Sequence, residues 1–232
     1  MGSLVRALVV AATSLLLLVP ASAGASASPR ASLAAILAAG RAQHSVHYVA
    51  IANNGVSRTR LVCDVATTSG IQRITFEEGG RTGKVTVLVS AGSAYIRGDS
   101  FILTSYLGFK PAGAVRYAGK WIRIPPSDRA YAPVSAAVTL RSTIDEFELN
   151  GPLTFLPPKT VAGQKTIGIK GTVGKPAAQA SLYARAAGTP LPVGEVETFG
   201  KALDETLLSR WNEPVHVQVP TRSVPIGATG LE

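Results

Sequence analysis

Apolar and polar residues alternate with a period of two over several short segments, which is the pattern of half-buried β-strands. These segments are 46–52, 57–67, 72–78, 84–90, 93–97, 119–125, 164–173, 180–188 and 214–220. The first five follow one another closely, with glycine-rich turns between several of them, and so predict an antiparallel meander. In the last segment, three valines alternate with polar residues before Pro220 ends the run. It predicts a strand with one apolar face.

Three other segments place apolar residues at helical spacing. They are residues 28–44, with Ser32 as the expected N-cap, residues 99–109, with Ser100 in that role, and residues 128–149. Runs of strands interrupted by helices favour an α+β fold with an antiparallel sheet over an alternating βαβ arrangement. A sheet with one apolar face needs helices to cover that face.

The N-terminus is apolar and is followed by small residues, as in a secretory signal peptide over residues 1–27. Two Ala-Ser-Ala sites predict cleavage after Ala23 or after Ala27, and an uncleaved anchor is the alternative. We therefore expect a secreted, periplasmic or cell-wall protein. Residues 28–220 would form one domain, and residues 221–232 a disordered C-terminal tail.

The net charge of +9 does not by itself indicate a binding function, because the basic residues stand one at a time among apolar ones. Nucleic-acid binding would require a basic stripe with interleaved aromatic residues, which the sequence lacks. A solvated basic surface is the simpler interpretation. Attraction to anionic lipid headgroups or cell-wall polymers is the functional alternative.

Residues that could carry chemistry are scarce. The sequence has no Gly-x-Ser-x-Gly, no His-Glu-x-x-His and no phosphate-binding glycine loop. Three histidines and one cysteine make a poor metal-ligand set, and Cys63 stands among apolar residues that predict a core position. We expect no cofactor, no metal and no enzymatic activity.

The apolar surplus is the informative feature. In strands 57–67 to 84–90 the residues of one parity are Leu61, Cys63, Val65, Ile74, Phe76, Val85, Val87 and Val89, and we assign the opposite face to Arg60, Asp64, Gln72, Lys84 and Thr86. Helices over 101–107 and 134–147 should cover the apolar face with Leu103, Leu107, Leu140, Ile144 and Phe147. These surfaces could form either a dry core or an open cavity.

The order of several segments resembles the actinobacterial LppX/LprG-like lipoproteins of the LolA/LolB-like half-barrel superfamily. They are "SVHYVA" (45–50), "GGRTGKVTVLVSAGSAYIRG" (79–98), "GKWIRIP" (119–125), "YARAAGTPLPVG" (183–194) and "LSRWNEPVHVQVP" (208–220). The resemblance implies a strongly curved antiparallel sheet whose helices cover the concave side around an apolar cavity. It also implies binding of acyl lipids or glycolipids and their transport across the cell envelope, with the apolar residues above lining the cavity. Segment 214–220 would be the last strand, its valines facing the concave side.

One departure from the family is the missing lipobox cysteine at the end of the signal, so an acyl anchor is not expected. The partners implied are a lipid or glycolipid and a transient contact with an anionic membrane surface or an envelope transporter, with the protein as a monomer. The alternative is an envelope interaction or stress-sensor protein of the same fold that binds a protein partner. An enzyme would need a polar triad at the cavity mouth.

Overall fold

The computed structural model describes residues 27–230 except 137 and 175. The predicted signal peptide, apart from Ala27, therefore lies outside the described residues. Among the helices that are described, none combines the length and the hydropathy that crossing a membrane requires.

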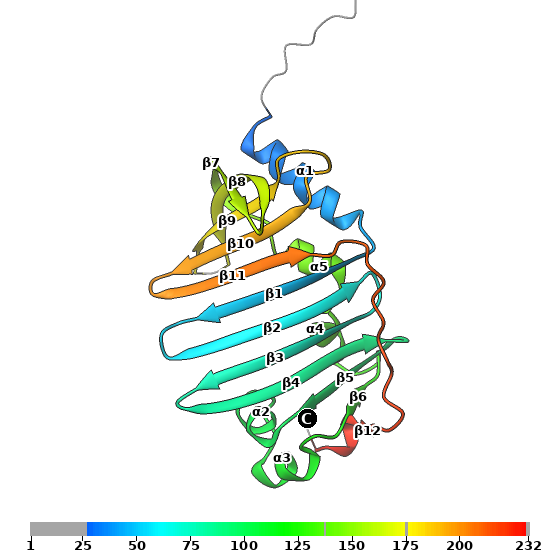
Figure 1. The fold of residues 1–232 in the computed structure, drawn as a ribbon. Helices are drawn as coiled ribbons and strands as arrows, with labels where there is room; N and C mark the ends of the chain where they lie inside the picture. The colour runs from blue at the N-terminus through cyan, green and yellow to red at the C-terminus, as the bar shows by residue number, and fades with distance from the viewer. Residues whose placement is uncertain (1–26, 137, 175, 231–232) are drawn as a thin grey trace, which may run out of the picture.

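Twelve strands of the described residues form one open sheet in the order β12-β6-β5-β4-β3-β2-β1-β11-β10-β9-β8-β7 (Figure 1). Neighbours are antiparallel, except that β12 runs parallel to β6. The strands are β1 Ser45–Asn53, β2 Ser57–Ala66, β3 Gly70–Glu78, β4 Arg81–Ser90, β5 Ser93–Gly98, β6 Ile122–Ile124, β7 Asn150–Val161, β8 Gln164–Val173, β9 Ala178–Arg185, β10 Pro192–Phe199, β11 Ala202–Ser209 and β12 Val224–Pro225.

The sheet consists of two meanders. Strands β1 to β6 form the first and strands β7 to β11 form the second, and each pairs along its length with its neighbours in sequence. The two join where β1 pairs with β11, for example at Tyr48 opposite Leu208. We call this pairing the seam.

Helices cover one side of the sheet. They are α1 Pro29–Arg41, α2 Ser100–Ser105, α3 Pro111–Tyr117, α4 Tyr131–Ala136, α5 Leu140–Asp145 and the 3-10 turn η1 Ile226–Ala228. Helix α1 contacts β7, β10 and α5, α2 contacts β4 and β5, and α4 contacts β5. Figure 1 views the sheet from the opposite side, so α4 and α5 appear behind the strands.

We call the helix-covered side the inner face and the other the outer face. Residues directly opposite each other on neighbouring strands share a face. Val65, Gly70 and Val89 form one such inner row, and two glycines in the inner rows allow close packing. A methyl group on Gly70 would collide with the Val138 backbone carbonyl, and one on Gly83 would lie 2.5 Å from Ile102 Cδ1. Val138, which lies just before α5, and helix α2 can therefore pack directly on the sheet.

The predicted α+β half-barrel is confirmed, and the predicted strands of the first meander are present with slightly different ends. The helices are shorter than expected. Ser28, not Ser32, caps α1 by accepting a hydrogen bond from the Ala31 amide, and Asp99, not Ser100, caps α2. The single helix expected over 128–149 is two helices, because Thr139 has an extended backbone and begins α5 as its N-cap.

The C-terminal segment differs most from expectation. Residues 214–220 pair with no strand, so their predicted role as the last strand of the sheet is wrong. The segment instead passes in front of the ends of β1 to β5 toward β6 (Figure 1), on the side where Arg210 forms an ion pair with Asp64. Val215 and Val217 are half-buried, while His216 and Gln218 are exposed.

The predicted disorder of residues 221–232 is also not found in the described part of this tail. Val224 and Pro225 pair with β6 as β12, and η1 follows. The hydroxyl of Tyr117 donates a hydrogen bond of 2.8 Å to the Ala228 carbonyl. Ile226 packs against buried apolar residues of both hydrophobic clusters. Apolar packing thus holds the end of the chain in place.

Candidate functional site

The thirteen residues predicted to line a cavity lie on the inner face or in its helical cover, and they fall into two groups. Eight are buried: Cys63, Val65, Val85, Val89, Leu103, Leu140, Ile144 and Phe147. Five are only partly buried: Leu61, Ile74, Phe76, Val87 and Leu107. The first group belongs to the packed core, whereas the second group still exposes apolar surface. Their role in lipid binding stays a prediction.

The strand members of the second group form a continuous surface that we call the apolar strip: Leu61, Ile74, Phe76 and Val87. Leu61 lies opposite Ile74, and Phe76 and Val87 are on the adjacent inner rows. Beside the strip, Phe76 stacks on Tyr106 with 4.5 Å between ring centroids. The strip therefore runs across β2, β3 and β4, with aromatic residues of α2 and its C-cap at one end.

An apolar cavity of about 140 Å³ lies at the β5–β6 end of the inner face. It is lined by Ile96, Leu107, Phe109, Ile122, Ile124, Ala130, Val134 and Ile226. Ile96 is directly opposite Val87, so the cavity adjoins the apolar strip. Of the predicted lining residues, Leu107 borders this cavity. Ile226, from the tail that we expected to be disordered, borders it as well.

One assignment of faces was wrong. Gln72 was expected on the outer face, but it has the same parity as Ile74 and lies opposite Cys63 on the inner face, 6% exposed. Burial raises the pKa of the Cys63 thiol to about 11, so the thiol stays protonated near neutral pH. This agrees with a core position for Cys63.

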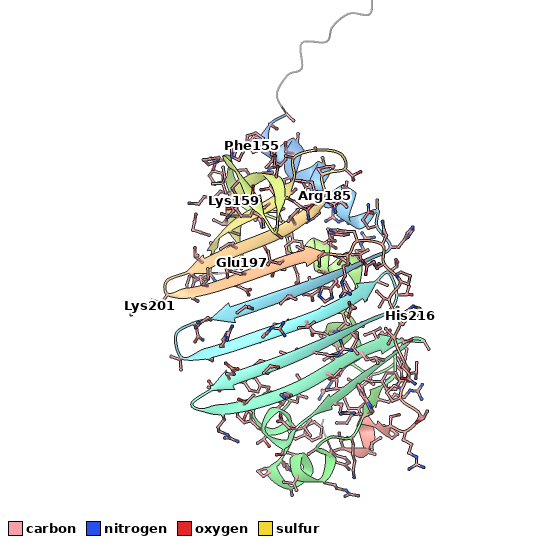
Figure 2. The ribbon with its side chains drawn as sticks, viewed as in Figure 1. Phe155, Lys159, Arg185, Glu197, Lys201 and His216 are labelled. Carbon is pink, nitrogen blue, oxygen red and sulfur yellow. The ribbon has the colours of Figure 1, made fainter. Side chains whose placement is uncertain are left out.

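Beyond the seam the inner face becomes acidic. Glu195 and Glu197 of β10 point to it, Asp204 lies opposite Glu197 on β11, and Glu146 follows α5. We call these four residues the carboxyl cluster. Figure 2 shows Glu197 on β10 and Lys201 at the tip of the β10–β11 hairpin. The ion pairs found among the described residues use Asp64, Asp145 and Glu213 as their acidic partners, and none includes the cluster.

Solvation of the carboxyl cluster is uneven: Glu195 is buried, Glu197 and Asp204 are partly buried, and Glu146 is exposed. Glu195 is only 5% exposed, and its Oε1, like Oδ1 of Asp204, has no hydrogen-bond partner among the described residues. Desolvation by the surrounding protein raises the pKa of all four groups. For Glu195 the neighbouring charge of Glu197 raises the pKa further, and for Glu197 the charge of Asp204 does the same. These groups resist ionisation unless a cation joins them.

A second cavity, of about 240 Å³, opens beside the cluster at the strand ends. Glu197 and Asp204 contribute to its wall, together with Ala52, Thr59 and Phe199. Phe199 is 54% exposed at the tip of β10. The cavity thus combines two carboxyl groups with apolar and small side chains and with Asn53 and Asn54.

The outer face is basic over the first meander. Its exposed cations are Arg58, Arg60, Arg73, Lys84, Arg97 and Arg123. Asp64 is the main local counter-charge, with His47 Nδ1 at 2.8 Å, Arg210 Nη2 at 3.2 Å and Arg73 Nη1 at 3.8 Å from its carboxylate oxygens. Most of these cations remain available to an external anionic partner.

Sequence reasoning missed the carboxyl cluster. The signal was present in "EVET" (195–198), where two glutamates share one strand parity, and in Asp204 of the next strand. Neither segment was recognised as a strand, so the shared face could not be seen.

Comparison with known proteins gives structural likeness without sequence likeness. Neither a protein-family model nor a curated protein sequence matches the chain. The structure is similar to that of LprF from Mycobacterium bovis, with a TM-score of 0.56 and 16% identity over 83% of this chain and 98% of that one. It is also similar to the lipoprotein LppX from Mycobacterium tuberculosis, with a TM-score of 0.52 and 18% identity over 82% of this chain and 100% of that one. The chain therefore has an LppX/LprG-like fold.

Proposed function

We propose that this protein binds the acyl chains of a lipid or glycolipid on its inner face and carries them across the cell envelope without a chemical step. The observation that carries the proposal is the apolar strip, which stays partly exposed beneath the helices and adjoins an apolar cavity. A sheet that only needed a dry core would bury these side chains, because exposed apolar area costs about 25 cal/mol per Å². The LppX/LprG-like fold is consistent with this use.

The cavity must enlarge to hold a lipid. Its volume of about 140 Å³ is below the roughly 300–1,000 Å³ that is usual for ligand sites. Helix α4 is the element most suited to move, since none of its described residues is buried and it contributes Val134 to the cavity wall. Outward displacement of α4 would join the cavity to the apolar strip.

Transport also requires export and contact with membranes. The pattern of residues 1–27 supports export to the envelope or secretion. The basic outer face supports transient attachment to an anionic membrane, leaving the inner face free for the ligand. The intact mass of the exported protein tests the first point. Loss of the first 23 or 27 residues without an acyl adduct is expected, and a retained N-terminus or an adduct would contradict it.

The central experiment uses mass spectrometry of lipids extracted from the exported protein. We expect acyl lipid in stoichiometric amount. In Val87→Trp the indole would occupy the apolar strip, and bound lipid should fall at least about tenfold while the fold remains. Thr86→Trp is the matched control, because it adds the same bulk one residue earlier, on the outer face.

Two results would contradict the proposal. One is a wild-type protein that never carries lipid, either as exported or after incubation with lipid vesicles. The other is an equal loss of lipid in Val87→Trp and Thr86→Trp, which would point to general destabilisation instead of a blocked site. Thermal unfolding of each variant separates the two causes.

Membrane contact is tested with vesicles of increasing anionic lipid content. Binding should rise with anionic lipid and fall with added salt. The double variant Arg60→Gln/Lys84→Gln should bind more weakly than Arg116→Gln/Lys120→Gln, which loses the same charge from α3 and the residues beyond it. Equal binding by the two variants would mean that the basic outer face is not the docking surface.

A further inference from the structure

The carboxyl cluster has a feature that packing does not explain. Glu195, Glu197 and Asp204 share the inner face of β10 and β11, and Glu146 follows α5. Glu195 is only 5% exposed, and its Oε1 has no hydrogen-bond partner among the described residues. A buried carboxyl oxygen without a hydrogen-bond partner costs free energy, so an unliganded cluster of this kind destabilises the fold. A cation at the cluster would remove that cost.

We propose that the carboxyl cluster is a subsite for the cationic ammonium group of an amphiphilic ligand whose hydrocarbon part lies on the apolar strip. The proposal rests on the proposed function, because it assigns a headgroup chemistry to the same inner face. The ammonium group would enter through the cavity of about 240 Å³ that Glu197 and Asp204 border. Glu195 lies deeper, on the same strand as Glu197.

The strand register connects the cluster to the strip. One inner row runs from Glu197 through Asp204, Ala52 and Thr59 to Phe76. Between the carboxyl groups and the aromatic ring stand only a methyl group and a threonine, so a hydrocarbon chain can lie across the seam. Neighbouring strands are about 4.8 Å apart, which puts Asp204 roughly 14 Å from Phe76.

The next inner row leads the same way. It runs from Glu195 through Thr206 and Ala50 to Leu61 and Ile74. Small side chains again separate an acidic end from an apolar end. Two neighbouring rows with the same order of chemistry form a path suited to a molecule with a charged head and an apolar body.

A metal ion fits the cluster less well than an organic cation does. In the described part of the chain, no three histidine, cysteine, aspartate or glutamate side chains are placed to hold one metal ion. The carboxyl groups are instead spread over two strands and the end of α5, a spacing that a bulky ammonium group can bridge. Surrounding alanine and phenylalanine side chains suit the methyl or methylene groups next to such a nitrogen.

The cations described near the end of α5, Arg41 and Arg141, pair with Asp145 and not with the cluster. On the inner face, β9 presents Ala180 and Leu182, β1 presents Tyr48 and β2 presents Cys63. Burial raises the pKa of Tyr48 and of Cys63, so both are neutral near neutral pH. Helix α5 adds the hydroxyl of Thr143. The negative charge of the ionised cluster is therefore left for a ligand to balance.

Titration calorimetry with three eight-carbon probes tests the subsite near neutral pH, each below its micelle concentration: octyltrimethylammonium, octanol and octanoate. Octyltrimethylammonium should bind about tenfold or more tightly than octanol, and octanoate should bind most weakly. Its binding should release protons, seen as heats that differ between buffers of unlike ionisation enthalpy, because the cation favours the ionised carboxyl groups.

Variants locate the effect. Glu197→Gln/Asp204→Asn should lose about tenfold or more in affinity for octyltrimethylammonium and keep its affinity for octanol. Glu205→Gln is the matched control, since Glu205 follows Asp204 on β11 but lies exposed on the outer face. The amide substitutions keep the shape of the side chains, and thermal unfolding checks that the fold survives.

The outcomes separate the two proposals. Equal binding of the ammonium and alcohol probes, or an affinity unchanged by Glu197→Gln/Asp204→Asn, overturns the cationic subsite and leaves acyl binding standing. Tighter binding of octanoate also overturns it. Failure of all three probes, in a protein that carries no extracted lipid, overturns acyl binding and the subsite together.

Discussion

The two meanders present opposite chemistry on the same inner face. In the first, the inner rows of β2 to β4 are apolar apart from Thr59, Gln72 and the strand ends, and part of that surface stays exposed as the apolar strip. In the second, β10 and β11 place carboxyl groups on the inner face, where Glu195 is buried and Oδ1 of Asp204 has no hydrogen-bond partner among the described residues. The seam between β1 and β11 separates the two regions, with Ala50 and Ala52 on its inner side.

The comparison shows two ways in which a covered sheet can depart from an ideal core. The first meander leaves apolar surface without cover, which favours an apolar ligand. The second buries polar groups without partners, which favours a ligand of opposite charge. Neither departure improves the stability of the free protein, and both point toward binding.

The largest expected effect compares how tightly side chains pack in the core and in the apolar strip of the first meander. Val65→Trp should lower the free energy of unfolding by about 3 kcal/mol or more, because Val65 is fully buried and has no space for an indole. Val87→Trp should cost about 1 kcal/mol or less, because Val87 belongs to the partly exposed strip. Chemical denaturation of both variants provides the measurement. Equal losses would show that the strip is as tightly packed as the core.

The carboxyl cluster predicts a dependence of stability on pH. The pKa of Glu195 is raised by burial and then by the charge of Glu197, so the folded protein holds this proton to higher pH than the unfolded chain does. The free energy of unfolding should therefore fall as the pH rises from the usual range of glutamate through the raised pKa. Glu195→Gln removes this carboxyl group, and with it the difference in bound protons between the folded and the unfolded states.

We expect Glu195→Gln to flatten this pH profile and to stabilise the protein near neutral pH by about 1–2 kcal/mol. Glu205→Gln, on the exposed outer face, should leave the profile unchanged. Denaturant unfolding at a series of pH values gives both curves. A Glu195→Gln profile as steep as that of the wild type would show that Glu195 is not buried as described.

A smaller effect is expected where the chain end completes the apolar region. Ile226→Ala should lower the free energy of unfolding by about 1 kcal/mol, because Ile226 is partly buried against both hydrophobic clusters. The same change enlarges the cavity, so affinity for an acyl probe should not fall. Unfolding and octanol binding by the variant test the two statements. A loss of octanol binding would show that Ile226 is needed as a contact.

The smallest effect concerns the outer face. Arg210→Gln removes one of the cations around Asp64, and half-exposed ion pairs contribute about 0–1 kcal/mol. We expect a loss within that range which disappears at high salt. His47 and Arg73 remain near Asp64, so the carboxylate keeps partners. A larger loss in Arg210→Gln would show that this contact holds the whole C-terminal segment in place.

The first meander could be predicted because its alternation has the usual sense, with apolar side chains on the covered face and charged ones outside. β11 has the reverse order: Asp204 and Thr206 face inward, while Leu203 and Leu207 lie exposed on the outer face. β7 contains three prolines, which its position at the sheet edge tolerates. Such strands do not carry the alternation of apolar and polar residues from which a half-buried strand is predicted.

The C-terminal valines show the opposite error. Alternation in residues 214–220 correctly indicates an extended chain with one side more buried, but pairing with a neighbour needs a free strand edge. Both edges of β1 are already occupied, by β2 and β11. The segment therefore crosses the strand ends (Figure 1). A local sequence pattern cannot show that no strand edge is free to pair with it.

The seam also has a consequence for the order in which the chain folds. Each meander consists of neighbours in sequence, so its hairpins close short loops, whereas pairing of Val49 with Leu207 closes a loop of most of the chain. Contacts between distant residues form slowly. We expect the hairpins of the first meander to form first, leaving the β1 edge exposed until β11 arrives. A chain shortened before β11 would keep that edge unpaired, and an unpaired edge promotes aggregation.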